Sequence, residues 1–93
     1  LKDDETEIAV ITAREETERK MTEDWLRLNE IPFDKLLMRG NNDKRSDWDV
    51  KEQLFINNYN WEQIWFVLED RKGCVDMWRG QGLTCLQVAP GDF

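Results

Sequence analysis

Histidine does not occur in this 93-residue sequence, which removes the commonest general base and the commonest zinc ligand. Acid–base chemistry would therefore have to use carboxylates or lysine. Cysteine is scarce, and Cys74 and Cys85 lack the spacing of metal ligands, so we expect two buried, reduced thiols. No run of about 18 apolar residues and no basic-then-apolar leader is present, so we expect no membrane span and no signal peptide, with a reducing cytoplasm as the default setting.

Glycine-rich phosphate loops are missing as well. Neither the dinucleotide fingerprint nor the P-loop pattern occurs, so any phosphate must be held by side chains. The 13 basic residues are outnumbered by 20 acidic ones, for a formal charge of −7, which argues against a surface that coats nucleic acid and leaves room for a local basic pocket. With 40% hydrophobic residues, the chain suffices for one small domain and not for two.

Short apolar, β-branched runs alternate with longer amphipathic segments. The runs predict strands at residues 8–12, 35–39, 64–68 and 84–88. The segments between them predict helices over 15–29, from a cap at Ser46 or Asp47 to about 58, and over 72–79. Strands that alternate with helices demand a parallel sheet with right-handed crossovers. The sequence therefore predicts an α/β fold with a Rossmann-like parallel sheet and flanking helices.

Glu69 and Asp70 come directly after the strand expected at 64–68, whose continuous apolar residues indicate burial on both faces. In open parallel sheets, ligands bind at the carboxyl ends of the strands, and two adjacent carboxylates suit Mg²⁺. Acids also commonly precede a helix, and here they would cap the one that begins near Lys72. From the residues alone, both interpretations stay open.

Basic residues gather around the polar connection at 40–45, where Arg39, Lys44 and Arg45 fall within seven residues. Such loops above a rigid sheet are where function concentrates. Thr12 and Arg14 lie at the end of the first predicted strand, in a similar place. Taken singly, the arginines read as surface charges and Thr12 as a strand-end residue or helix cap.

Five tryptophans allow a base-stacking platform, but their helical and strand spacing favours packing in the core or between subunits. They are Trp25, Trp48, Trp61, Trp65 and Trp78. We assign Trp78 to packing.

Three motifs together resemble the haloacid dehalogenase (HAD) superfamily of phosphotransferases. VITAR (10–14), VKE (50–52) and LEDR (68–71) resemble its motifs two, three and four. With Met38 and Arg39, residues 43–47, residues 75–79, Gly82 and Leu83, and the C-terminal signature at 87–93, the ordered set is similar to the phosphatase domain of bacteriophage polynucleotide kinase. This resemblance covers the chain from about residue 8 to its last residue.

The resemblance implies Mg²⁺-dependent hydrolysis of a phosphomonoester through an aspartyl-phosphate, in closer relatives a 3′-phosphate at a nucleic-acid end during repair. It implies hydrogen bonds from Thr12 to the phosphoryl oxygens and a fixed positive charge from Lys51, which otherwise reads as an exposed helix lysine. Asp70, with Glu69, would hold the Mg²⁺. The candidates for gripping the phosphate or the strand beyond it are Arg14, Arg39 and Arg45.

One part of the superfamily pattern is missing. Its opening strand ends in Asp-x-Asp, which supplies the nucleophile and the acid–base, and Asp3-Asp4 follows no apolar run that would make it a substitute. That strand is central in the family's sheet, between those represented here by 8–12 and 64–68. We therefore expect residues 1–93 to form a single partial domain with motifs two to four, inactive alone. Glu69 and Ala13 stand where the family usually has Asp and Gly.

Three functions follow from these observations. The chain is the C-terminal segment of a HAD-type polynucleotide 3′-phosphatase whose nucleophile lies outside it, which we prefer. Alternatively, it is a non-catalytic remnant that binds phosphate or nucleic-acid ends. The third alternative is an assembly module, in which a missing N-terminal segment, a partner strand or a second copy completes the sheet.

Overall fold

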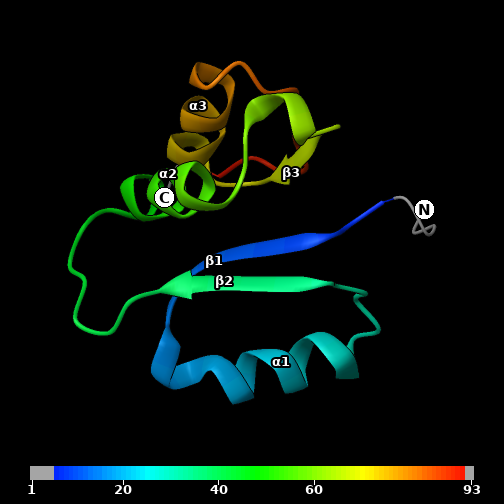
Figure 1. Ribbon diagram of the computed structural model, residues 1–93, viewed down its shortest axis with the longest axis vertical. Coiled ribbons are helices and arrows are strands. Elements are labelled where there is room, and N and C mark those ends of the chain that lie inside the picture. Colours follow the sequence, from blue (N-terminus) through cyan, green and yellow to red (C-terminus); the bar gives the residue numbers. More distant parts are fainter. Residues whose placement is uncertain (1–5, 92–93) are drawn as a thin grey trace. The chain divides into compact units, whose positions relative to one another are not determined.

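The computed structural model describes residues 6–91 (Figure 1). The chain divides into two compact units, an N-terminal unit, Leu1–Lys44, and a C-terminal unit, Arg45–Phe93. Each unit contains one pair of parallel strands with helices around it. The predicted class, α/β with parallel strands and flanking helices, is confirmed. Among residues 6–91, β1 pairs with no strand other than β2, and β3 with none other than β4.

The N-terminal unit is built on β1 (Ala9–Glu15) and β2 (Lys35–Arg39), which pair in parallel with Val10 opposite Leu36. The 3₁₀ helix Glu16–Glu18 and α1 (Arg19–Leu28) connect them, and α1 lies alongside the pair (Figure 1). A small core forms where Leu26 of α1 meets Leu36 and Met38 of β2, with Val10 and Phe33 packed against it. This core fixes the position of β1, which carries Thr12 at its midpoint.

The first helix begins later than the sequence predicts, at Arg19 instead of residue 15. β1 stays extended to Glu15 because the register shifts after Thr12 and Glu15 still pairs with Arg39. The helix then gains local ion pairs, with Arg19 bonded to Glu16 at 2.7 Å and Lys20 to Asp24 at 3.2 Å.

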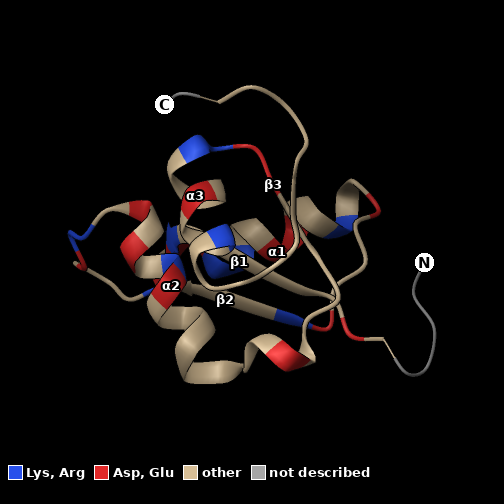
Figure 2. Ribbon diagram, turned by 90° about the horizontal axis from the view of Figure 1, so that it is seen from above, with Lys and Arg blue, Asp and Glu red and all other residues tan. Residues whose placement is uncertain are grey.

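The C-terminal unit contains α2 (Asp47–Asn58), the 3₁₀ helix Trp61–Gln63, β3 (Val67–Glu69), α3 (Lys72–Gly80) and β4 (Cys85–Gln87). β3 and β4 are parallel, with Leu68 opposite Leu86 and Glu69 opposite Gln87. Its core lies between α2, α3 and β4, where the Phe55 and Trp78 rings meet edge to face at 5.7 Å. Both signs of charge occur on α2 and on α3 (Figure 2).

The strand predicted at 64–68 is wrong in its start and its burial. β3 begins at Val67, because Asn60 and Gln63 close a capping box and Ile64 N donates to Trp61 O at 3.1 Å. Nor is it buried on both faces: Trp65 is 72% exposed and Leu68 60% exposed. α3 packs against both strands of this sheet, whereas Leu68 and Leu86 on the strands are each more than half exposed.

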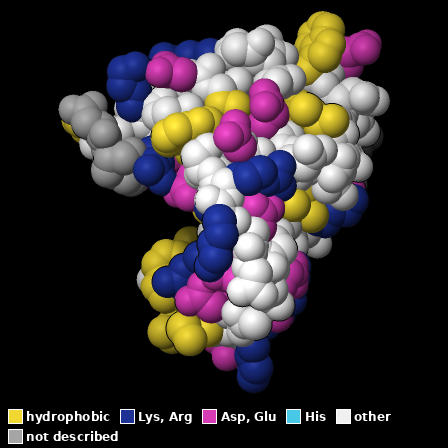
Figure 3. Space-filling model, turned by 90° about the vertical axis from the view of Figure 1, so that its left-hand side faces the viewer, with side chains coloured by type: hydrophobic (Ala, Val, Ile, Leu, Met, Phe, Trp, Pro, Cys, Tyr) yellow, Lys and Arg dark blue, Asp and Glu magenta, His cyan; other side chains and the backbone are white. Residues whose placement is uncertain are grey.

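Trp78 is buried as predicted. The other tryptophans are exposed, so they are not part of the core, and their packing between subunits stays a prediction: Trp25, Trp48, Trp61 and Trp65. Hydrophobic side chains accordingly reach the surface between charged ones on the face drawn in Figure 3. Both cysteines are free and buried, as predicted, and burial raises the pKa of the Cys74 thiol. Within residues 6–91, no helix has the length and apolarity needed to span a bilayer.

Candidate functional site

Thr12 lies where β1 departs from regular pairing. It is opposite Met38, and the next pair along the strands is Glu15 with Arg39, so Ala13 and Arg14 form a bulge. The Thr12 hydroxyl accepts a hydrogen bond from the Arg14 backbone N–H at 3.2 Å. The bulge places two of the predicted residues, Thr12 and Arg14, at the end of β1, where the Arg14 side chain is exposed.

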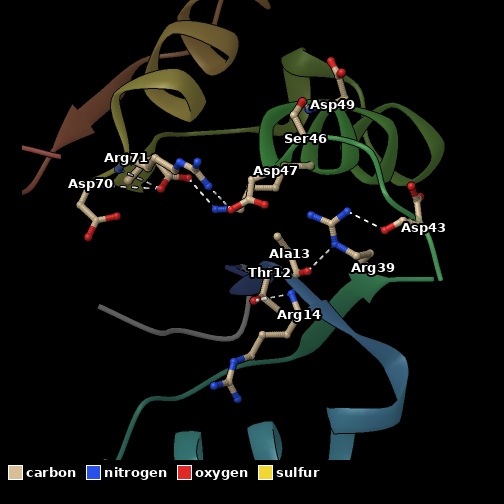
Figure 4. A network of polar contacts seen from close by, with 12 residues as sticks. Thr12, Ala13, Arg14, Arg39, Asp43, Ser46, Asp47, Asp49, Asp70 and Arg71 are labelled. Atoms are coloured by element: carbon tan, nitrogen blue, oxygen red, sulfur yellow. Dashed lines mark hydrogen bonds and ion pairs between the residues drawn. The ribbon is translucent and has the colours of Figure 1, made fainter. Parts of the chain in front are cut away.

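Arg39 is buried and holds the bulge in place. Its Nε donates to the Ala13 carbonyl at 2.6 Å and its Nη1 to the Asp43 carbonyl at 2.8 Å, so the guanidinium bridges β1 and the following loop (Figure 4). The sequence singled out this arginine for substrate. The structure gives it a backbone-supporting contact set that residue spacing does not reveal.

The loop after β2 is tied to the segment after β1 by residues that the sequence analysis missed. Thr17 N donates to the Asn41 side chain at 3.0 Å, and Asn42 N donates to the Glu15 carboxylate at 2.8 Å. Asn42 has a φ of 65°, a left-handed conformation that asparagine tolerates well. Asn41 and Asn42 belong to the polar connection expected at 40–45, but their long-range partners are visible only in the folded chain.

Glu69 is the centre of the polar network in the C-terminal unit. Its Oε1 accepts from Lys51 Nζ at 3.0 Å and from Trp78 Nε1 at 3.2 Å. Its Oε2 lies 3.3 Å from the backbone N–H groups of both Asp70 and Arg71. The Lys51 and Glu69 side chains are 14% and 9% exposed, so the ion pair is shielded from water. α2 supplies the lysine, β3 the glutamate and α3 the tryptophan.

The environment of Glu69 keeps it ionised. Burial pushes the pKa of its carboxyl upward, but the charge of Lys51 and hydrogen bonds from Lys51, Trp78 and the Arg71 backbone outweigh that effect. The net pKa lies below its ordinary value. Because both carboxylate oxygens already accept two hydrogen bonds each, Glu69 has little capacity left for a metal ion.

Asp70 differs from Glu69 in exposure and in the hydrogen bonding of its carboxylate. Its side chain is exposed, and within residues 6–91 the structure records no hydrogen bond or ion pair to its carboxylate. The described residues contain no cluster of three or more His, Cys, Asp or Glu side chains that could enclose a metal. Mg²⁺ commonly takes one or two carboxylates and completes its shell with water and phosphate oxygens. The carboxylate of Asp70 is available to such an ion, whereas the two oxygens of Glu69 already accept four hydrogen bonds.

Arg71 joins the starts of α2 and α3. It forms an ion pair with Asp47, and its guanidinium lies 5.5 Å from the centre of the Trp48 ring. Ser46 caps α2 by accepting from Asp49 N, as the sequence predicts. Arg45, another predicted substrate contact, is exposed just before this cap. These contacts orient α2 and so the Lys51 side chain one turn further along.

Known proteins are similar to this chain in sequence and in fold. The family described as polynucleotide kinase PNKP phosphatase domain matches residues 1–93. The solved structure of the Pnkp1/Rnl/Hen1 RNA repair complex contains a chain with 39% identity and a TM-score of 0.86, matched over 94% of this chain and 29% of that one. A second structure of a Pnkp1/Rnl/Hen1 complex gives 39% identity, a TM-score of 0.88, and coverages of 94% and 31%. This chain thus spans less than a third of those chains. It belongs to the HAD-type family of polynucleotide kinase PNKP phosphatase domains.

Proposed function

We propose that this chain is the C-terminal segment of a Mg²⁺-dependent phosphatase that hydrolyses phosphomonoesters, specifically 3′-phosphates at polynucleotide ends. The observation that carries the proposal is the shielded Lys51–Glu69 pair beside the exposed carboxylate of Asp70, in a chain of this family. RNA ends are the substrate class we favour, because the similar chains come from RNA repair complexes.

In this proposal the nucleophile is an aspartate outside these 93 residues. Its carboxylate attacks phosphorus, and the P–O bond to the 3′ oxygen breaks while the second aspartate of the upstream Asp-x-Asp gives that oxygen a proton. Water then attacks the aspartyl-phosphate, returns a proton to the second aspartate, and releases inorganic phosphate. Lys51 places its charge near the phosphoryl oxygens, and Glu69 holds Lys51 in the required orientation. Asp70 would hold Mg²⁺, which when bound neutralises charge on those oxygens.

The resemblance supplies further candidate phosphate contacts, of which Thr12, Arg14 and Arg39 belong to the N-terminal unit and Arg45 to the C-terminal unit. Thr12 would hydrogen-bond a phosphoryl oxygen from the bulge of β1. Candidates for contacts to the phosphate or the strand beyond it are Arg14, Arg39 and Arg45. Arg39 would also support the site indirectly. Its hydrogen bonds to the Ala13 and Asp43 carbonyls hold the bulge that carries Thr12 and Arg14.

A second, assembly function has its own support. Leu68 and Leu86 lie opposite each other on β3 and β4, and both are more than half exposed. We infer that another strand or layer covers this apolar face in the complete protein, supplied by the rest of the polypeptide or by a second copy.

The catalytic proposal is tested on the parent, defined here as the longest natural polypeptide that contains these 93 residues. We expect Lys51→Ala and Asp70→Asn each to lower Mg²⁺-dependent phosphate release from a 3′-phosphorylated oligonucleotide by at least about 100-fold. The matched controls are Lys20→Ala on α1 and Asp76→Asn on α3, both in exposed helical ion pairs. Full activity in both test variants would refute the assignment of the motifs.

A further inference from the structure

The C-terminal signature at 87–93 has no role in the chemistry proposed above, yet its described part lies against the turn that carries Asp70. Val88 N donates to the Glu69 carbonyl at 3.1 Å, which extends the β3–β4 ladder by one bond. Gln87 Nε2 donates to the Asp70 carbonyl at 3.1 Å. Lys72 N donates to the Gly91 carbonyl at 2.6 Å. Three hydrogen bonds therefore connect residues 87–91 to the strand–helix turn.

The bond to Gly91 replaces a missing helix cap. Arg71, the residue before α3, offers no side-chain hydrogen bond to the first turn of that helix. The Gly91 carbonyl accepts from the first helical N–H instead, and Gly91 is buried although residues 86–90 before it are exposed. The start of α3 is thus fixed by the far end of the chain.

The backbone of Asp70 is held by hydrogen bonds at both its N–H and its carbonyl. Its N–H points to Glu69 Oε2, and its carbonyl accepts from Gln87, while its carboxylate has no recorded partner within residues 6–91. Figure 4 shows that carboxylate pointing away from Arg71 and Asp47. The two hydrogen bonds fix the backbone position of Asp70, and the uncommitted carboxylate leaves its oxygens available to a cation.

We propose that Gln87 is a positioning residue for Asp70, and that residues 87–91 act as a strap which fixes the backbone position from which the Asp70 carboxylate reaches a divalent cation. The inference rests on the proposed function. It gives residues 87–91 a structural role, whereas the chemical steps proposed above do not involve them. Gln87 is exposed and makes a single bond to a carbonyl, so its loss should leave folding largely intact.

The test compares Gln87→Met with Gln53→Met in the parent. Both substitutions keep the length and the neutrality of the side chain and remove its amide group. Gln53, however, is exposed on α2 and donates to Asn57 instead of to the turn. Binding of Mn²⁺, as a paramagnetic substitute for Mg²⁺, is followed by electron paramagnetic resonance without substrate. Hydrogen exchange of the amides at 69–72 is measured in the same samples.

We expect Gln87→Met to weaken Mn²⁺ binding about tenfold, the low end for outer-shell partners, and to speed exchange at 69–72. Gln53→Met should change neither quantity. The inference is overturned if Gln87→Met binds Mn²⁺ as tightly as the unchanged protein while Asp70→Asn binds it weakly. If Asp70→Asn also retains full affinity, the metal assignment of the proposed function fails, and the role of Gln87 fails with it.

Discussion

Glu69 accepts hydrogen bonds from three separate elements, and this explains why a buried carboxylate is tolerated there. Lys51 supplies the compensating charge, Trp78 a neutral donor, and the following turn two backbone donors. Removing one partner of such a pair leaves an uncompensated charge in a poorly hydrated place. The position of Lys51 thus depends on Glu69 as much as on α2.

Glu69→Gln should destabilise the chain by about 3 kcal/mol at pH 7, because Lys51 loses its counter-charge. The sign of the pH dependence follows from the lowered pKa of Glu69. Its stabilising contribution is complete above the unfolded-state pKa and is lost as the pH falls through the folded-state pKa. Urea unfolding at pH 7 and pH 3 should therefore show a larger acid-induced loss for the unchanged chain than for Glu69→Gln.

The control for this measurement is Glu62→Gln, which alters an exposed glutamate in the same unit and should shift stability by less than about 0.5 kcal/mol. Equal pH dependence in the unchanged chain and in Glu69→Gln would contradict the role given to the ion pair.

The motifs predict Lys51, Glu69 and Asp70 as site residues, but they do not show which carboxylate pairs with Lys51 and which stays exposed. The two adjacent acids look equivalent in the chain. In the structure Glu69 is buried among donors and Asp70 is exposed. Trp78 was correctly assigned to packing, yet its hydrogen bond to Glu69 depends on the angle between β3 and α3, which spacing does not encode.

The contact between α2 and α3 depends on a glycine. A Cβ at Gly73 would lie 2.6 Å from Cε3 and 2.9 Å from Cζ3 of the Trp48 ring. The ring also lies against Arg71, so it cannot move aside without loosening the start of both helices. Close approach, and not a turn, is what requires glycine here.

Gly73→Ala should therefore destabilise the chain by about 1–2 kcal/mol, since overpacking exceeds the helix propensity that alanine gains. Gly80→Ala is the matched control on the same helix, because a Cβ there meets nothing within 4 Å. It should be neutral or stabilising by up to about 1 kcal/mol. Thermal unfolding measures the melting temperatures of both variants. Equal values would contradict the prediction, because they would mean that the Trp48 ring moves aside at no cost in stability.

Elements with a clear local signal were predicted well. β2 occupies the predicted residues 35–39, and α3 begins at Lys72 as expected. Errors arose where long-range pairing or local capping competes with the hydrophobic pattern. The bulge in β1 delays α1, and the Asn60–Gln63 capping box delays β3. Neither effect is visible in the apolar run itself.

At the scale of the molecule, the described chain consists of two compact units, each with one pair of parallel strands. Two observations fit the proposal of a segment that works within a larger protein. The face with Leu68 and Leu86 is exposed, and the chain spans less than one third of the related chains. The parallel pairing could be predicted from the alternation of elements. Its division into two pairs does not follow from that alternation, but it agrees with the resemblance, which places a missing strand between 8–12 and 64–68.

The central claim is that this chain supplies Lys51 and Asp70 to a phosphatase whose nucleophile lies outside it. The most direct test measures phosphate release from a 3′-phosphorylated oligonucleotide, with Mg²⁺ or with EDTA, by the parent and by the 93-residue chain in parallel. We predict Mg²⁺-dependent release by the parent, loss of that release in EDTA, and no release by the chain alone. Hydrolysis by the isolated chain, or an inactive parent that carries an upstream Asp-x-Asp strand, would contradict the account.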